Sequence, residues 1–183
     1  MSDDEISLIQ LARQGDAAAC ATLYDRHYDA VYRYCYYRVG DVPLAQDLTA
    51  EVFVRMVENL ETFDVRGRPL LAWLYAIARN LIADVYRKSG QEPQLSLNEA
   101  QLVGEDTLTQ QVEQRLLAED LAAALARLTE GQRQVILLKF VMNHDNAEVA
   151  RMLGKPQGAI KSLQHRALAA LRRALEQGRD HEA

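Results

Sequence analysis

The sequence predicts an all-α protein made of two small helical domains joined by a flexible linker. Apolar side chains recur at three- and four-residue spacing in most segments, which is the period of a helix with one buried face. No segment alternates apolar and polar residues well enough to require a β-strand. The helical periodicity disappears near residue 90, where the chain becomes polar and acidic. We therefore expect domains at 1–90 and 111–183, with the linker at 91–110.

The first domain is expected to contain four helices separated by turns. A short amphipathic helix at 6–14 ends at a glycine, and Asp16 is suited to cap a second, longer helix. Six tyrosines crowd that second helix, a composition more typical of core and interface positions than of base stacking. Pro43 suits the first turn of a third helix at about 43–60. Pro69 then opens a fourth helix with one apolar stripe.

Two surfaces of this domain carry side chains suited to binding. A charged stripe runs along the third helix at four-, four- and three-residue spacing and comprises Asp47, Glu51, Arg55 and Glu58. A solvated face with weak intrahelical ion pairs would give this pattern, and a docking surface is the alternative. The loop at 61–69 combines one aromatic residue with two arginines, which can hold the unstacked bases of a single strand.

The second domain is expected to end in a helix-turn-helix. A Thr-x-x-Gln capping box at 129–132 begins one helix, and Asp145 and Glu148 have the same spacing at the start of the next. Gly154 supplies the backbone freedom that the end of this helix requires. Pro156 suits the first turn of the last helix.

That last helix has an apolar back and a donor-rich front near its N-terminus, as a helix that enters the major groove of DNA requires. The front carries Gln157, Lys161, Ser162, His165 and Arg166. Two ordinary surface helices would also fit this stretch, so the rest of the chain has to decide the kind of DNA binding.

Charge and composition narrow the class of protein. The net charge is −5, but basic residues outnumber acidic ones at 61–90 and 127–173, which suits phosphate contact at two places. Cys20 and Cys35 match no metal or redox motif, and we expect two buried or half-buried thiols. No phosphate loop, metal-ligand cluster or nucleophile elbow supports an enzyme, a metal site or a cofactor. With no apolar span and no signal pattern, a cytoplasmic protein is expected.

Two blocks of sequence point to one family. The first contains DLTAEVF on the third predicted helix and WLYAIARNLIAD on the fourth, separated by the short basic loop. The second is LTEGQRQVILLKFV, followed by NAEVARMLGKPQGAIKSLQHRALAALRR. In this order and at this distance they resemble regions two and four of bacterial RNA polymerase sigma factors of the sigma-70 family, in the compact extracytoplasmic-function (group IV) branch. The resemblance covers most of residues 20–175.

The resemblance implies two roles for region two. It binds the clamp helices of the largest polymerase subunit, and the matching side chains on the third helix are Asp47, Leu48, Glu51, Phe53 and Arg55. It also captures the melted non-template strand of the promoter −10 element. The matching positions for that strand are Phe63, Asp64, Arg66, Arg68, Asn80, Arg87 and Lys88, with Trp73 expected to give core support.

Region four is implied to place its recognition helix in the major groove at the −35 element, through the five front residues named above. The implied partners are core RNA polymerase (the clamp helices and the flap of the second-largest subunit), promoter DNA and an anti-sigma factor that covers both docking surfaces. The linker would thread through the polymerase toward its RNA exit channel. No catalytic activity is implied.

Several positions depart from the family pattern. Ala50 stands where the family often has glutamine, Leu163 replaces an arginine of the recognition helix, and Pro156 stands where a serine or threonine cap is usual. These departures leave the family resemblance intact. Because some of them fall in the recognition helix, the base sequences of the promoter elements do not follow from the family pattern. The alternative function is a stand-alone regulator that binds duplex DNA as a dimer through 127–175, with 1–90 as a sensing or dimerising domain.

Overall fold

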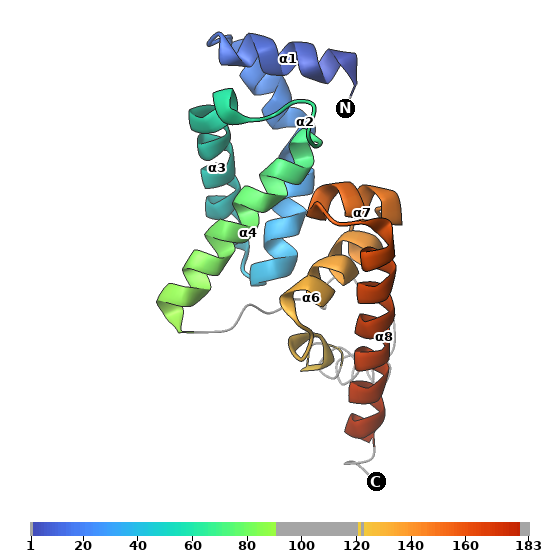
Figure 1. Cartoon of the computed structure of the whole chain (residues 1–183). Helices are drawn as coiled ribbons and strands as arrows, with labels where there is room; N and C mark the ends of the chain where they lie inside the picture. The colour runs from blue at the N-terminus through green and yellow to red at the C-terminus, as the bar shows by residue number, and fades with distance from the viewer. Residues whose placement is uncertain (1, 91–120, 122, 180–183) are drawn as a thin grey trace, which may run out of the picture.

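The structure is a computed structural model that describes residues 2–90, 121 and 123–179. The described secondary structure is helical throughout, which confirms the all-α prediction (Figure 1). The first group of helices comprises α1 (Asp3–Arg13), α2 (Ala17–Val39), α3 (Val42–Asn59), the 3₁₀ turn η1 (Leu60–Thr62) and α4 (Leu70–Ser89). The second comprises α6 (Glu130–Ile136), the π-helical segment η3 (Leu137–Val141), α7 (Asn146–Leu153) and α8 (Gln157–Arg179). The predicted linker at 91–110 lies outside the described residues.

The α1–α4 bundle forms around α2, which packs against the other three helices. Local chemistry sets the boundaries of these helices: the predicted cap at Asp16 is present, whereas α1 begins at Asp3, three residues before its predicted start. The Asp16 carboxylate accepts a hydrogen bond from the Ala19 amide at 2.9 Å and so caps α2. Gly40 ends α2 in the left-handed region (φ 69°), a conformation that costs glycine little. Asp41 then caps α3 through the Leu44 amide at 2.8 Å.

Tyrosines line much of α2, as expected of core and interface positions. The rings of Tyr34 and Tyr75 stack with centroids 4.7 Å apart, and both side chains are buried. Along a neighbouring side of α2, Tyr28, Tyr32 and Tyr36 stack at successive spacings of 6.0 Å. The tyrosines therefore contribute both to the core and to a half-buried ladder on the bundle surface.

The second group forms a helix-turn-helix on a preceding helix. Both predicted capping boxes are present, one at Thr129 and Gln132 before α6 and one at Asp145 and Glu148 before α7. Gly154 ends α7 at φ 61°. Pro156 differs slightly from its prediction: it precedes α8, and its carbonyl accepts the amides of the first turn.

The segment after α6 differs more from the predicted regular helix. Residues Leu137–Val141 widen into a π-helical turn, in which the Met142 amide donates to the Leu137 carbonyl at 2.9 Å. The widening keeps Leu137 and Leu138 buried while Phe140 is exposed.

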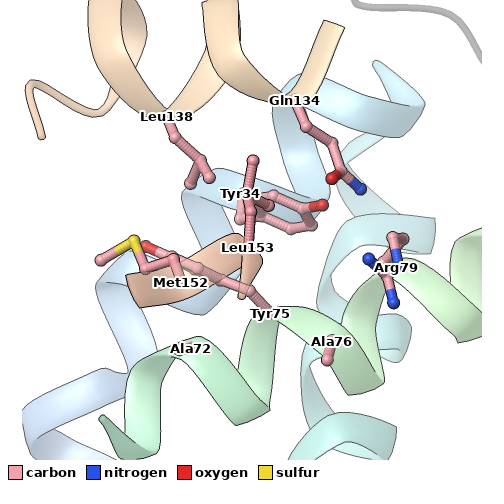
Figure 2. A pocket seen from close by; sticks show the side chains of 9 residues that line it. All are labelled: Tyr34, Ala72, Tyr75, Ala76, Arg79, Gln134, Leu138, Met152 and Leu153. Carbon is pink, nitrogen blue, oxygen red and sulfur yellow. The ribbon is translucent and has the colours of Figure 1, made fainter. Parts of the chain in front are cut away.

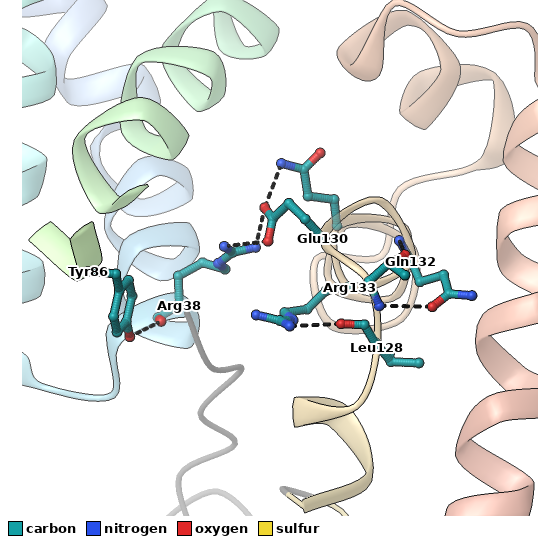
Figure 3. A network of polar contacts seen from close by, with 8 residues as sticks. Arg38, Tyr86, Leu128, Glu130, Gln132 and Arg133 are labelled. Carbon is teal, nitrogen blue, oxygen red and sulfur yellow. Dashed lines mark hydrogen bonds and ion pairs between the residues drawn. The ribbon is translucent and has the colours of Figure 1, made fainter. Parts of the chain in front are cut away.

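The two groups of helices contact each other along α2 and α4 on one side and α6, η3 and α7 on the other. Figure 2 shows Tyr34 and Tyr75 facing Leu138, Met152 and Leu153 across a narrow pocket. Polar contacts extend this interface: Arg33 Nη2 donates to the Val141 carbonyl at 3.3 Å, and Arg38 pairs with Glu130 (Figure 3). We call these residues together the interdomain contact.

Candidate nucleic-acid interface

The first half of α8 presents polar side chains on one exposed face. Lys161, Ser162, His165 and Arg166 line an open hollow on the surface, and Gln157 is exposed one turn earlier. On the opposite side Ile160 and Ala167 are fully buried against the preceding helices. The structure therefore brings all five predicted front residues to the outside of a helix that is fixed by its back.

The donors on this face are largely uncommitted. Ser162 Oγ donates to the Gly158 carbonyl at 3.0 Å, and Arg166 Nε donates to the Ser162 carbonyl at 3.3 Å. Within the described part of the chain, the side chains of Lys161 and His165 make no polar contact. The remaining guanidinium donors of Arg166, with these two side chains, are therefore available to base edges or phosphates.

The loop between η1 and α4 has a buried beginning and a basic, exposed middle. Phe63 is 4% exposed, and its ring stacks on Trp73 at 5.0 Å between centroids. Asp64 Oδ1 accepts the Arg66 amide at 3.0 Å, and the Gly67 amide donates to the Asp64 carbonyl at 3.2 Å. Phe63 and Asp64 therefore shape the loop through these contacts, and Arg66 and Arg68 are its exposed cations.

The other residues predicted to meet the −10 strand are spread along α4 rather than gathered in one pocket. Asn80 lies ten residues into the helix, roughly 15 Å from its start. Arg87 and Lys88 lie about 10 Å further, in the last turn, where Arg87 Nη2 also pairs with Asp84 at 2.8 Å. Asn80 and Arg87 are both exposed and two turns apart, so they share a face of α4.

The predicted polymerase-binding residues of α3 divide between surface and core. Asp47 and Arg55 are exposed and Glu51 is half-buried, with Arg55 Nε donating to Glu51 Oε1 at 2.8 Å. Hydrogen bonding to Glu51 raises the pKa of Arg55. Leu48 and Phe53 are buried in the bundle, so they hold α3 in place rather than forming its outer face.

Sequence reasoning missed the apolar part of that outer face. Val57 is 55% exposed, and Val54 is 50% exposed. The Val54–Val57 spacing of three residues, among Glu51, Arg55 and Glu58, was the available signal. Two exposed valines between charged side chains make α3 a mixed apolar and charged surface, which is typical of protein interfaces.

The two cysteines are free thiols in the described residues, and they differ in burial. Cys35 is fully buried, and burial raises the pKa of its thiol to about 11. Cys20 is half-buried. Among the residues that the structure describes, no three His, Cys, Asp or Glu side chains are grouped to hold a metal ion. None of the described helices is long and apolar enough to cross a membrane.

The structure combines a four-helix bundle, in which α3 exposes apolar and charged side chains, with a helix-turn-helix that has an exposed recognition face. This combination defines a two-part DNA-binding protein. The family models give the particular class. Residues 23–92 match sigma-70 region 2, and residues 118–171 match sigma-70 region 4. The chain belongs to the extracytoplasmic-function (ECF) RNA polymerase sigma factors of the sigma-70 family, as the resemblance in its sequence implied.

Named relatives support this assignment over nearly the whole chain. The ECF sigma factor BldN of Streptomyces coelicolor is 39% identical over 93% of this chain and 65% of its own length. The ECF sigma factor SigW of Bacillus subtilis is 32% identical over 91% of this chain and 94% of its own. Among solved structures, CnrH in complex with the cytosolic domain of CnrY aligns with a TM-score of 0.63 and 25% identity, covering 96% of this chain and 99% of that one.

Proposed function

We propose that this protein is a promoter-specificity subunit that binds core RNA polymerase, recognises the −35 and −10 elements and captures the melted −10 strand. The observation that carries the proposal is the recognition face of α8. Lys161, His165 and Arg166 point outward from a helix whose back is buried at Ile160 and Ala167. Such a helix can enter a major groove without rearranging its own domain.

The −10 element is assigned to the first domain. Arg66 and Arg68 of the loop contact the displaced strand, and Asn80 reads a base edge. Arg87 and Lys88 hold phosphates further along α4, and Phe63 and Asp64 keep the loop in shape. The support for this assignment is the basic loop beside a firmly packed helix, an arrangement suited to an unpaired strand.

Polymerase binding is assigned to the outer face of α3. Asp47, Glu51 and Arg55 give charge complementarity with the clamp helices of the largest subunit, and Leu48 and Phe53 fix the helix from inside. Val54 and Val57 add apolar area to the same surface. The remaining partners are the flap of the second-largest subunit and an anti-sigma factor, both of which membership of the family implies.

The domain plan of the proposal is region two at 1–90, a linker at 91–110 and region four at 111–183. The subunit itself has no catalytic role, and it acts in the cytoplasm together with the polymerase. Residues 111–120 of the second domain lie outside the described part of the chain.

The test is reconstitution of the full chain with bacterial core polymerase. We expect a one-to-one complex on a sizing column and run-off transcripts from a subset of genomic fragments. Sequence-specific binding of the chain alone to duplex DNA, without a polymerase complex, would instead establish the stand-alone regulator.

A further inference from the structure

Arg13, the last residue of α1, makes two hydrogen bonds to the segment that leads into the basic loop. Its Nε donates to the carbonyl oxygen of Leu60 at 3.1 Å. Its Nη2 donates to the carbonyl oxygen of Phe63. These acceptors lie 47 and 50 residues away in the sequence, and they bracket the η1 turn from which the loop departs. Figure 1 shows α1 lying beside this turn.

A guanidinium shared between two carbonyls fixes the chain more firmly than two separate neutral hydrogen bonds. The donor is charged, and its planar fork sets the relative position of both acceptors. The carbonyls also stand at the C-terminal end of α3 and η1, where the helix dipole favours a positive charge. Arg13 therefore connects the C-terminal end of α1 to the segment that follows α3.

From Phe63 the constraint continues into the basic loop. The buried ring of Phe63 stacks on Trp73, so that residue is held by its backbone and its side chain together. The next residue, Asp64, accepts the amide of Arg66. A series of contacts therefore leads from Arg13 through Phe63 and Asp64 to the backbone of Arg66.

Arg13 lies outside residues 23–92, the part of the chain that matches sigma-70 region 2. We propose that Arg13 is a positioning residue for the loop at 63–68, and that α1 thereby preorganises Arg66 and Arg68 for the melted −10 strand. This inference rests on the function proposed above. Its physical basis is that a preformed loop loses less conformational freedom when it binds a flexible single strand.

The test compares Arg13→Ala and Arg13→Lys with the unchanged chain, each assembled with core polymerase. A fluorescein-labelled single strand carrying the −10 sequence of a promoter found by run-off transcription is titrated by anisotropy. We expect Arg13→Ala to weaken strand binding about five- to tenfold and Arg13→Lys, with a charged but unforked donor, to restore part of it. Polymerase binding and −35 duplex binding should stay within about twofold.

Arg26→Ala is the matched control. Arg26 of α2 pairs with Asp4 of α1 at 2.6 Å, so it also ties α1 to the bundle, and among the described residues it makes no hydrogen bond or ion pair with the loop. We expect this variant to bind the −10 strand like the unchanged chain. Equal weakening by Arg26→Ala and Arg13→Ala would show that only the attachment of α1 matters, and would overturn the positioning role.

Amide hydrogen exchange gives a readout that does not depend on DNA. In Arg13→Ala, exchange should accelerate at residues 60–67 and stay unchanged at the opposite end of α4. Unchanged exchange at 60–67, or undiminished strand binding by Arg13→Ala, would refute the inference. If the unchanged holoenzyme fails to bind the −10 strand at all, the proposed function fails and not merely the role of Arg13.

Discussion

The guanidinium of Arg38, at the end of α2, holds the carboxylate of Glu130, at the start of α6, through two hydrogen bonds of 2.9 and 3.0 Å (Figure 3). The two residues are 92 positions apart, and they join the two groups of helices. The Arg38 side chain is 2% exposed, whereas that of Glu130 is 45% exposed. Gln134 donates to the same carboxylate at 3.0 Å, and Tyr86 donates to the Arg38 carbonyl at 2.9 Å.

Glu130→Ala should loosen the interdomain contact. The substitution leaves the buried Arg38 guanidinium without its carboxylate, and we expect the free energy of unfolding to fall by about 1–2 kcal/mol. This loss is smaller than for a fully buried pair because Glu130 is partly exposed. The radius of gyration from small-angle X-ray scattering should rise as the two groups separate. Glu176→Ala, which removes the exposed pair with Arg172, is the control and should change neither quantity appreciably. An unchanged radius for Glu130→Ala would contradict the expectation.

Lys161→Ala and Arg166→Ala should each weaken binding to −35 duplex DNA about tenfold, because each removes a cation from the exposed face of α8. If the removed side chain binds a phosphate, the slope of log affinity against log salt should fall by about one. Fluorescence anisotropy with a duplex probe gives both values. Arg173→Ala, also exposed but about two turns beyond Arg166, is the matched control. If it weakens binding as much as Arg166→Ala does, the effect reflects overall charge and not the recognition face.

Charge reversal on α3 should separate polymerase binding from DNA binding. We expect Asp47→Arg and Glu51→Arg to abolish co-elution with core polymerase. Each replaces a carboxylate with a cation, which would face the polymerase surface that is complementary to the original negative charge. Val54→Asp should act in the same direction with little loss of stability, because Val54 is half exposed. Binding of −35 duplex should be unaffected. Asp25→Arg, an exposed reversal on α2, should still co-elute. Retention of the complex by all three α3 variants would place the polymerase surface elsewhere.

The two cysteines should differ in reactivity. Burial holds the pKa of Cys35 at about 11, so iodoacetamide should modify Cys20 first and reach Cys35 only on unfolding. The same shift predicts a loss of stability at high pH. Between the ordinary thiol pKa of 9.0 and about 11, the unfolded chain releases this proton while the folded chain keeps it, so the free energy of unfolding falls as pH rises. Cys35→Ala should reduce this pH dependence. Thermal unfolding at several pH values and mass spectrometry of alkylated protein measure these effects.

Local sequence signals predicted most helix boundaries of the fold. Asp16, Thr129 and Asp145 each cap a helix through an amide three residues away, so the signal and its effect lie within one turn. The π-helical turn at Leu137–Val141 has no comparable local signal, because it depends on which apolar side chains the neighbouring helices can bury.

The candidate sites were predicted less completely, for a physical reason that Phe63 and Val57 illustrate. Both are apolar residues at the edge of a helical segment, where periodicity does not say which side a neighbour will cover. Phe63 is buried because Trp73 lies across it, and Val57 is exposed because α2 and α4 pack elsewhere on α3. The bonds from Arg13 to Leu60 and from Arg38 to Glu130 join distant parts of the chain, which a pattern along the sequence does not relate.

The stack of Phe63 on Trp73 also equips the protein with an intrinsic optical probe. Trp73 is the single tryptophan of the chain, so its emission reports on one place only, the base of the loop at 63–68. Tyrosines of the bundle transfer excitation energy to Trp73. Excitation at a wavelength that only tryptophan absorbs removes the contribution of the tyrosines to the emission. A shift in the emission spectrum on adding an oligonucleotide or a polymerase fragment would therefore locate the event at this loop, in the native sequence and without a label.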